Sequence, residues 1–305
     1  MISIVASENA KEALHPLALA YARKHIDCQW ISSCKDIPDV NLLEALAEES
    51  KAIMVVGAPR RSPRNTLPGP LIKRKNGQSI PLSWLPEKNF ETLRHFANAA
   101  SKVHSRKLKI QPVAILSQRH KRYLHLACRI ESLLSECREK TPAFLWTSDL
   151  LLRENMLEGL QGGMALALYV GHGRPIGWVG YYGTRKHHFE FGQGEPLGAL
   201  LSLCCSTASR KRTGLSFAEA IPLQGAAAAS FGAVSDTLHT DNTRWAVRIA
   251  KSLEKGVNTI GELIVAAQPP TLSAMKSYRI FGDPLAPLVG SDLSFQIAKK
   301  IKTYP

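Results

Sequence analysis

The sequence predicts an α/β protein in which a mostly parallel sheet, flanked by helices, is divided between two packed subdomains. Short apolar segments of strand length alternate with amphipathic segments of helix length up to residue 57, and the alternation resumes after residue 105. This alternation is typical of βα units that build a parallel sheet. Two later apolar runs each end in a reactive side chain, as buried parallel strands do at their carboxyl ends.

The amino-terminal subdomain is expected to span residues 1–105. Its predicted strands are segments 2–6, 28–32 and 51–57, and its predicted helices are segments 11–25, 40–49 and 89–104. Pro, Gly, Arg and Lys interrupt the pattern between residues 58 and 85. We therefore expect a long surface loop or an inserted hairpin there, close to the junction of the subdomains.

The second subdomain is expected to span residues 106–305. Predicted strands 109–116 and 143–147 alternate with predicted helices 120–139 and 150–159. The two informative apolar runs follow, MALALYVGHG at 164–173 and LGALLSLCCSTAS at 197–209. If these runs form adjacent parallel strands, His172 and Cys205 meet at one edge of the sheet.

The composition favours a globular protein that needs no disulfide to fold. Hydrophobic residues make up 45% of the 305 residues, which is ample for a buried core. The cysteines show no CxxC or metal-binding spacing, and they are Cys28, Cys34, Cys128, Cys137, Cys204 and Cys205. The sequence has no apolar run of the ~18 to 20 residues needed for a membrane span, and it opens without a basic leader. These features predict a reduced, cytoplasmic protein without bound metal.

The net charge of +14 raises the expectation of a polyanionic partner such as nucleic acid or an anionic membrane. The positive charge gathers in predicted loops, at Arg60, Arg61 and Arg64, at Lys73, Arg74 and Lys75, and at Arg210, Lys211 and Arg212. No aromatic residues are interleaved with these runs, so a solvated basic surface is favoured and an electrostatic docking patch is the alternative. Neither GxGxxG nor a P-loop follows the first strand, which argues against nucleotide binding.

His172 and Cys205 are the candidate catalytic pair. A thiol nucleophile needs an imidazole beside it, because the thiolate attacks and a free cysteine is mostly protonated at neutral pH. Taken alone, His172 is better explained as a structural residue at a strand end and Cys205 as a buried inert thiol. A catalytic role is favoured by their joint pattern, in which a strand leads to Gly-His-Gly and, after a loop, a second strand leads to Cys. The N–H groups of Gly173 and Cys205 are candidates for an oxyanion hole, with a tight turn at Gly171 and Gly173 as the alternative.

Five ordered segments resemble gingipain-type cysteine peptidases of the caspase-like superfamily. YVGHGRPIGW (169–178) resembles their histidine segment and LLSLCCSTASRKRTGLSFAEAI (200–221) their cysteine segment. The resemblance continues through LQGAAAASFGAVSDT (223–237), TIGELIVAAQ (259–268) and FGDPLAPL (281–288), and covers most of residues 145–290. It implies the caspase-like fold and a cysteine endopeptidase that uses His172 and Cys205 without a cofactor.

The resemblance also assigns finer roles. It aligns Cys204 with the small residue that precedes the nucleophile, and it puts Ser206 where related proteases commonly have glycine. It implies that residues 234–241 line the substrate pocket, where Asp236 or Asp241 would bind an Arg or Lys side chain, with ordinary loop-capping roles as the alternative. Glu219 is expected in a helix, and Asp283 in an Asx-type turn before Pro284.

Other functions remain possible on the sequence alone. A non-catalytic adaptor with the caspase-like fold is one alternative, and a basic nucleic-acid-associated protein is another. An intracellular protease without a pro-segment is expected to be regulated, so besides a protein or peptide substrate we expect an activator or an inhibitory partner.

Overall fold

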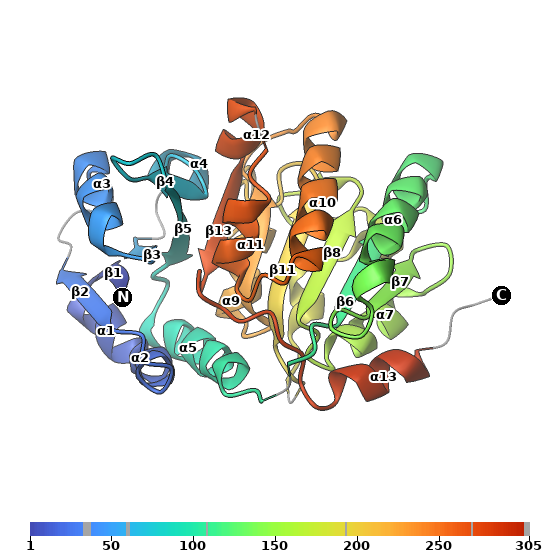
Figure 1. Cartoon of the computed structure of the whole chain (residues 1–305), viewed down its shortest axis with the longest axis horizontal. Helices are drawn as coiled ribbons and strands as arrows, with labels where there is room; N and C mark the ends of the chain where they lie inside the picture. Colours follow the sequence, from blue (N-terminus) through green and yellow to red (C-terminus); the bar gives the residue numbers. More distant parts are fainter. Residues whose placement is uncertain (33–37, 59–61, 108, 193, 270, 302–305) are drawn as a thin grey trace.

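One large sheet with helices on both faces forms the centre of the molecule (Figure 1). The computed structural model describes residues 1–32, 38–58, 62–107, 109–192, 194–269 and 271–301. The strands of the sheet are β1 (Ile2–Ala6), β2 (Cys28–Ser32), β3 (Ala52–Gly57), β4 (Leu71–Lys73), β5 (Ser79–Pro86), β6 (Val113–Ser117), β7 (Ala143–Thr147), β8 (Leu166–Val170), β11 (Leu197–Leu203), β12 (Ala227–Ala233) and β13 (Tyr278–Gly282). A separate hairpin pairs β9 (Gly173–Arg174) with β10 (Gly177–Trp178).

The helices connect and cover these strands. They are α1 (Glu8–Ala13), α2 (His15–Ala22), α3 (Val40–Glu49), α4 (Pro63–Thr66), α5 (Phe90–His104), α6 (Lys121–Leu134), α7 (Arg153–Leu160), α8 (Gly180–Gly183), α9 (Phe217–Leu223), α10 (His239–Glu254), α11 (Ile260–Ala266), α12 (Leu272–Lys276) and α13 (Ser294–Lys300). Two 3₁₀ turns, Ser135–Cys137 and Lys186–Phe189, complete the set. The predicted α/β class with a mostly parallel sheet is confirmed.

Strand direction divides the sheet into two parallel sets. The order is β2-β1-β3-β5-β13-β12-β11-β8-β6-β7, with β4 paired to β5. Strand β13 runs parallel to β5 but antiparallel to β12, so the set from β12 to β7 points opposite to the set from β2 to β13. Because β13 comes from the second predicted subdomain and pairs with β5 from the first, residues 1–105 and 106–305 share one continuous sheet. The boundary at residue 105 stays a prediction.

Several predicted elements need correction. The predicted helix 11–25 is two helices with a break at Leu14, because Pro16 lacks a backbone N–H and is accommodated in the first turn of a new helix, α2, which begins at His15. The predicted strand 109–116 begins only at Val113. Of the two options for residues 58–85, the hairpin is confirmed by β4 and β5, and β5 is a buried strand of the main sheet rather than a surface loop. Arg60 and Arg61 lie outside the described residues.

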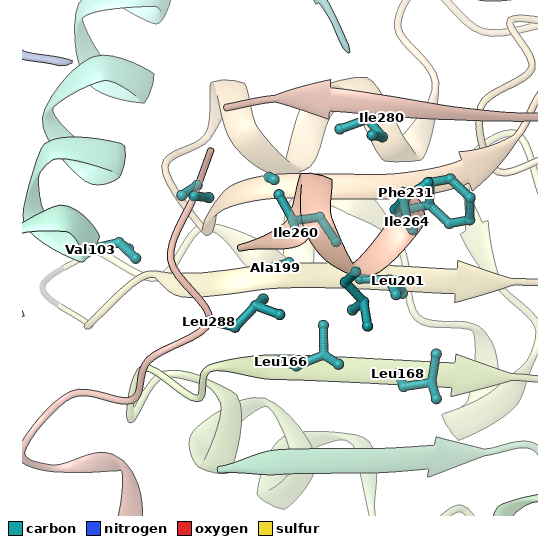
Figure 2. Packing of buried hydrophobic residues seen from close by; sticks show 14 of the residues in the cluster. Val103, Leu166, Leu168, Ala199, Leu201, Phe231, Ile260, Ile264, Ile280 and Leu288 are labelled. Carbon is teal, nitrogen blue, oxygen red and sulfur yellow. The ribbon is translucent and has the colours of Figure 1, made fainter. Parts of the chain in front are cut away.

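Alternate side chains of the central strands pack against helices on opposite faces. Leu166 and Leu168 of β8, with Ala199 and Leu201 of β11, point toward α11, which contributes Ile260 and Ile264 (Figure 2). The intervening residues, such as Ala167 and Leu200, belong to a second cluster with α7 and α9. Each fully buried Leu or Ile contributes about 1.5–3 kcal/mol, so the strands that position the site are firmly fixed.

A buried polar cluster links the two halves of the chain. The Asp283 carboxylate accepts a hydrogen bond from the Tyr21 hydroxyl at 2.5 Å and lies 2.7 Å from His104 Nε2. It also accepts the Leu285 N–H at 2.8 Å, which confirms the predicted Asx-type turn. Tyr21 and His104 belong to α2 and α5, so this turn ties the end of β13 to the amino-terminal helices.

Candidate active site

The register of the central strands brings the two predicted catalytic residues to the same level. Strands β8 and β11 pair in parallel, and Val170 of β8 lies opposite Leu203 of β11. His172 and Cys205 each follow two residues later, at the carboxyl edge of the sheet. Strand β6 ends at the same level, since Ser117 pairs with Val170. The expected adjacency of the two runs is confirmed.

The backbone of His172 is held from three directions. Its N–H donates to Gln118 Oε1 at 2.8 Å, and its carbonyl accepts from the Tyr169 hydroxyl at 3.1 Å and from the Val179 N–H at 3.0 Å. Tyr169 is itself fixed by stacking on Trp178, with ring centroids 4.4 Å apart. The imidazole therefore projects into solvent from a rigid loop.

Tyr123 is the neighbour of the His172 ring. The Tyr123 hydroxyl lies 3.4 Å from His172 Nε2, and the two rings meet edge to face at 5.4 Å. Burial raises the pKa of Tyr123, so the phenol stays protonated and is able to donate to the imidazole. The same tyrosine also contacts the His239 ring at 5.7 Å, at the start of α10.

There is no room for a side chain at either glycine that flanks His172. A Cβ on Gly173 would lie 2.4 Å from the Cys205 carbonyl oxygen and 2.5 Å from Cys204 Sγ, and a Cβ on Gly171 would lie 2.3 Å from the Tyr169 hydroxyl. Neither glycine has a positive φ. The histidine loop thus packs directly against the backbone of the two cysteines, and this contact sets the distance between the two halves of the site.

Cys205 is partly exposed and its thiol faces Thr237. The Thr237 N–H donates to Cys205 Sγ at 3.4 Å, and the Thr237 hydroxyl lies 3.5 Å from the sulfur. Between the described His172 and Cys205 side chains there is no direct hydrogen bond. Within the described ranges the Cys205 N–H also has no hydrogen-bond acceptor, so this amide is free to bind another oxygen.

Cys204 has a different environment from Cys205. It is fully buried beneath Gly173, and burial, with a further contribution from Cys205, raises the pKa of its thiol well above the ordinary value. A thiol that resists ionisation in this way is a poor nucleophile.

The two aspartates predicted for the substrate pocket lie in different places. Asp236 is exposed on the loop beside Cys205, where its carboxylate accepts the Ser206 hydroxyl at 2.8 Å. Ser206 itself has a φ of +58°, the left-handed conformation that glycine adopts more easily. Asp241 lies in the first turn of α10, is 6% exposed and pairs with Arg244 at 3.1 Å. The predicted loop 234–241 therefore ends where α10 begins, at His239.

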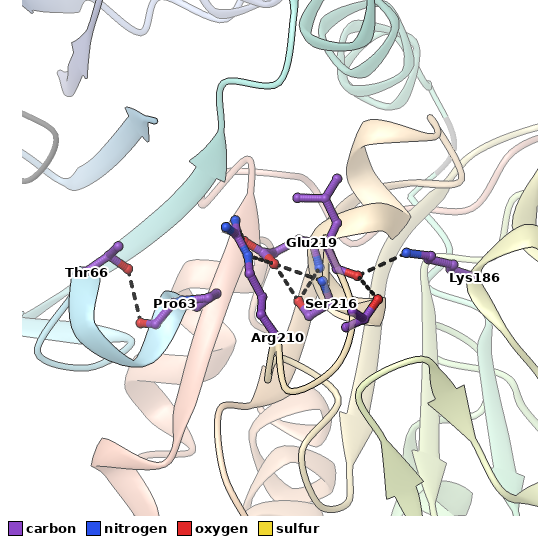
Figure 3. Close-up of polar contacts among 8 residues, drawn as sticks. Pro63, Thr66, Lys186, Arg210, Ser216 and Glu219 are labelled. Carbon is purple, nitrogen blue, oxygen red and sulfur yellow. Dashed lines mark hydrogen bonds and ion pairs between the residues drawn. The ribbon is translucent and has the colours of Figure 1, made fainter. Parts of the chain in front are cut away.

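The segment that follows the cysteines is anchored by a buried ion pair (Figure 3). Arg210 Nε donates to Glu219 Oε2 at 2.8 Å, and Glu219 also caps α9 by accepting from the Ser216 N–H and hydroxyl. The prediction that Glu219 lies in a helix is confirmed. Arg210 is only 10% exposed at its side chain, so the interpretation of residues 210–212 as a wholly solvated basic loop is wrong for this residue.

Four residues of this region were missed at the level of sequence: Gln118, Tyr123, Tyr169 and Thr237. Gln118 follows β6 directly, so the rule that reactive side chains gather at strand ends points to it. Tyr169 lies three residues before the histidine in YVGH. Thr237 lies in the segment 234–241 that was predicted to line the pocket, although its contact with Cys205 was not. Tyr123 reaches the site only through the packing of α6, which no local pattern reveals.

Two further features bear on the class of protein. No cluster of His, Cys, Asp and Glu in the described part of the chain is arranged to hold a metal ion. None of the helices in the described ranges combines the length and apolar character needed to cross a bilayer.

The mostly parallel sheet, with a histidine and a cysteine after the ends of two adjacent strands, is the arrangement expected of a caspase-like cysteine peptidase. A sequence profile of peptidase family C25 matches residues 115–289, more than half of the chain. The chain belongs to this family, and it is a cysteine peptidase. The matched range contains both His172 and Cys205.

Solved structures confirm the caspase-like fold. The complex of RgpB pro- and mature domains from Porphyromonas gingivalis superposes with a TM-score of 0.73 at 15% identity, over 94% of this chain and 79% of that chain. The Arg-specific cysteine proteinase gingipain R (RgpB) superposes with a TM-score of 0.70 at 15% identity, over 96% and 78% of the two chains. Among curated proteins no match was found.

Proposed function

We propose that this protein is an endopeptidase in which His172 activates Cys205. The observation that carries the proposal is the strand register, which puts both residues two positions beyond the paired Val170 and Leu203. In this mechanism the Cys205 thiolate attacks the substrate carbonyl, and the imidazolium then donates its proton to the leaving amine. Water hydrolyses the resulting thioester and regenerates the thiol. No cofactor enters these steps.

The adjacent Cys204 is the obvious competitor for the role of nucleophile. Its burial and raised pKa argue against it, whereas the Cys205 side chain is partly exposed and therefore accessible to a substrate carbonyl. Cys204 then serves as a packing residue beneath Gly173.

The proposed oxyanion hole consists of the Cys205 and Gly173 N–H groups. The unpaired Cys205 amide and the close approach of Gly173 to the Cys205 backbone support it. Each such donor contributes about 3 to 4 kcal/mol to the transition state in acyl-transfer enzymes.

The dyad is tested by labelling with a peptidyl electrophile followed by peptide mass spectrometry. We expect a single adduct on Cys205, no adduct in Cys205→Ala, and normal labelling of Cys205 in Cys204→Ala. His172→Ala should lose turnover to the same extent as Cys205→Ala, because the members of a catalytic unit fail together. An adduct on Cys204 would refute the choice of nucleophile, and the absence of any adduct would favour a non-catalytic adaptor.

We further propose a preference for Arg or Lys before the scissile bond, with Asp236 as the first candidate partner and Asp241 as the second. Asp236 is exposed beside Cys205, and the similar gingipain R is Arg-specific, which supports this assignment. A hydrogen bond to a charged group contributes about 1.5–3 kcal/mol, so Asp236→Ala should lower kcat/KM for basic substrates by roughly 10- to 100-fold. Neutral substrates should change far less. A peptide library that shows preference for Asp or for large apolar residues would contradict the proposal.

The proposed setting is the cytoplasm, under control by an inhibitory or activating partner. The exposed thiol of Cys128 suits a reducing compartment, and the similar RgpB is known in complex with its pro-domain. Cell fractionation and pull-down with the Cys205→Ala variant test the location and the partner separately.

A further inference from the structure

Three exposed cations stand beside the candidate active site, and their side chains form no hydrogen bond or ion pair with the described residues. They are Arg119, Lys121 and Arg122, which we call the basic rim. The residues that bracket them both contact His172, since Gln118 accepts its N–H and Tyr123 lies against its ring. The basic rim is therefore fixed at the edge of the site by contacts on either side of it.

The rim is not explained by the stability of its own helix. Lys121 and Arg122 occupy the first turn of α6, where the helix dipole favours acidic side chains, and that turn has no acidic residue. None of the three forms an ion pair within the described part of the chain. Three unpaired cations at the positive end of a helix repel one another, so their arrangement suits an anionic ligand.

The positive charge of the basic rim acts on a residue of the candidate active site. His239, whose ring contacts Tyr123, has its pKa lowered by burial and then by the charge of Arg122. Arg174, next to Gly173, adds another exposed cation at the site. Exposed acids at this edge include Asp149, Glu154 and Asp236. Glu154 pairs with Arg153, and Asp236 accepts a hydrogen bond from the Ser206 hydroxyl.

We propose that the basic rim binds acidic side chains that flank the scissile bond, so that the preferred substrates carry Asp or Glu near the cleaved residue. This inference rests on the proposed function, because it names the substrate class of the same site. A peptide suits the rim better than a nucleic acid does. The three cations lie within four residues at the start of α6 rather than along a stripe. Of the two rings among them, Tyr123 is buried, and His120 is held at the N-cap of α6 by the Arg122 N–H and against Tyr123, so neither is free to stack on a base.

The test compares two peptides with the same cleaved bond, one flanked by Glu and one by Gln. We expect kcat/KM to be about tenfold higher for the Glu-flanked peptide, since charge-steered association gains a factor of 10 or more. The advantage should shrink at high salt, because the Debye length falls from about 10 Å at 0.1 M to about 3 Å at 1 M.

Two triple variants test whether the preference for the Glu-flanked peptide comes from the basic rim. Arg119→Gln/Lys121→Gln/Arg122→Gln should bring the Glu-to-Gln ratio close to one. The control, Lys107→Gln/Lys109→Gln/Lys140→Gln, removes the same charge from exposed residues before β6 and β7, at the opposite edge of the sheet, and should keep the ratio of the original protein. If both triple variants lose the preference for the Glu-flanked peptide to the same extent, the inference is overturned, because the preference would then depend on the net charge of the protein and not on the basic rim.

Binding to the Cys205→Ala variant separates this inference from the proposed function. If that variant binds the labelled Glu-flanked peptide more tightly than the Gln-flanked one, and the rim substitutions abolish the difference, the basic rim is supported even if no peptide is cleaved. In that case the missing turnover and electrophile adduct would count against the protease mechanism alone. Equal binding of the two peptides would overturn the inference. So would rim substitutions that lower the affinity for a DNA duplex but leave peptide binding unchanged.

Discussion

Gly173→Ala is the substitution that most directly tests how the site is assembled. The new Cβ would lie 2.4 Å from the Cys205 carbonyl oxygen, 2.5 Å from Cys204 Sγ and 3.0 Å from the Thr207 methyl. Real Cβ contacts are essentially never below 3.0 Å, so the histidine loop and the cysteine backbone must separate by about 0.6 Å or more, the difference between 3.0 and 2.4. The carbonyl oxygen belongs to the backbone and cannot rotate away as a side chain does.

The expected loss of activity follows from this displacement. A misplacement of about 1 Å in a catalytic arrangement costs on the order of 100-fold, so we expect kcat/KM to fall by roughly 30- to 100-fold. Overpacking costs about 1–3 kcal/mol of stability, which leaves the protein folded at room temperature. Peptide hydrolysis and a thermal melt measure the two effects.

Gly214→Ala is the matched control. Gly214 lies in the segment after the cysteines and has no positive φ, and a Cβ at this position would have no atom within 4 Å, so the site should tolerate a methyl group. If Gly173→Ala keeps activity within about twofold of the original protein, or if Gly214→Ala loses as much, the close contact of the two loops does not set the catalytic geometry.

Three further predictions concern backbone strain, the buried cluster and pH. Ser206→Gly should keep kcat/KM and Ser206→Val should lose it, because a β-branched residue fits poorly at a φ of +58°. Asp283→Ala should lower the free energy of unfolding by at least about 2 kcal/mol in denaturant melts, since it leaves the buried Tyr21 hydroxyl and His104 ring without their partner, and Tyr21→Phe should cost less. Burial, with Asp283 nearby, raises the pKa of Cys28 from 9.0 to about 11, so the unfolded state ionises first and stability should fall between pH 9 and 11. Melts of Cys28→Ser should show a flatter pH profile in that range.

The strands that the sequence predicts best are short segments with clear ends. Segments 2–6, 28–32 and 143–147 match β1, β2 and β7 residue for residue, because neighbouring residues such as Ser7, Asp27 and Pro142 mark their ends. Strand β5 was harder to place, because it lies in a stretch rich in Pro and charge. Its partners β3 and β13 are distant in sequence, and the pairing that makes it a central strand is tertiary.

The meeting of His172 and Cys205 at one edge of the sheet was within reach of sequence reasoning, while the surroundings of the two residues were not. Strand ends in a parallel set gather at one edge, so two apolar runs ending near His172 and Cys205 suffice to predict that the two meet. Tyr123 enters the site from the first turn of a helix, and Thr237 from a loop, and both positions depend on how these elements pack against the sheet. Periodicity reports which face of an element is buried, but not which neighbour it meets.

The two aspartates proposed for the substrate pocket show which features the sequence does not determine. Asp236 and Asp241 are five residues apart in a segment without a strong capping signal, since the residue before α10 is Leu238, which makes no side-chain cap. Because α10 starts at His239, Asp241 falls in its first turn, where a carboxylate favours the helix dipole and pairs with Arg244. Asp236 stays in the loop, beside Ser206 and Cys205. Whether a carboxylate is free in a loop or supports a helix thus depends on a helix boundary, the feature that a sequence specifies least. For this reason the proposed dyad can be predicted from the sequence further than the proposed pocket can.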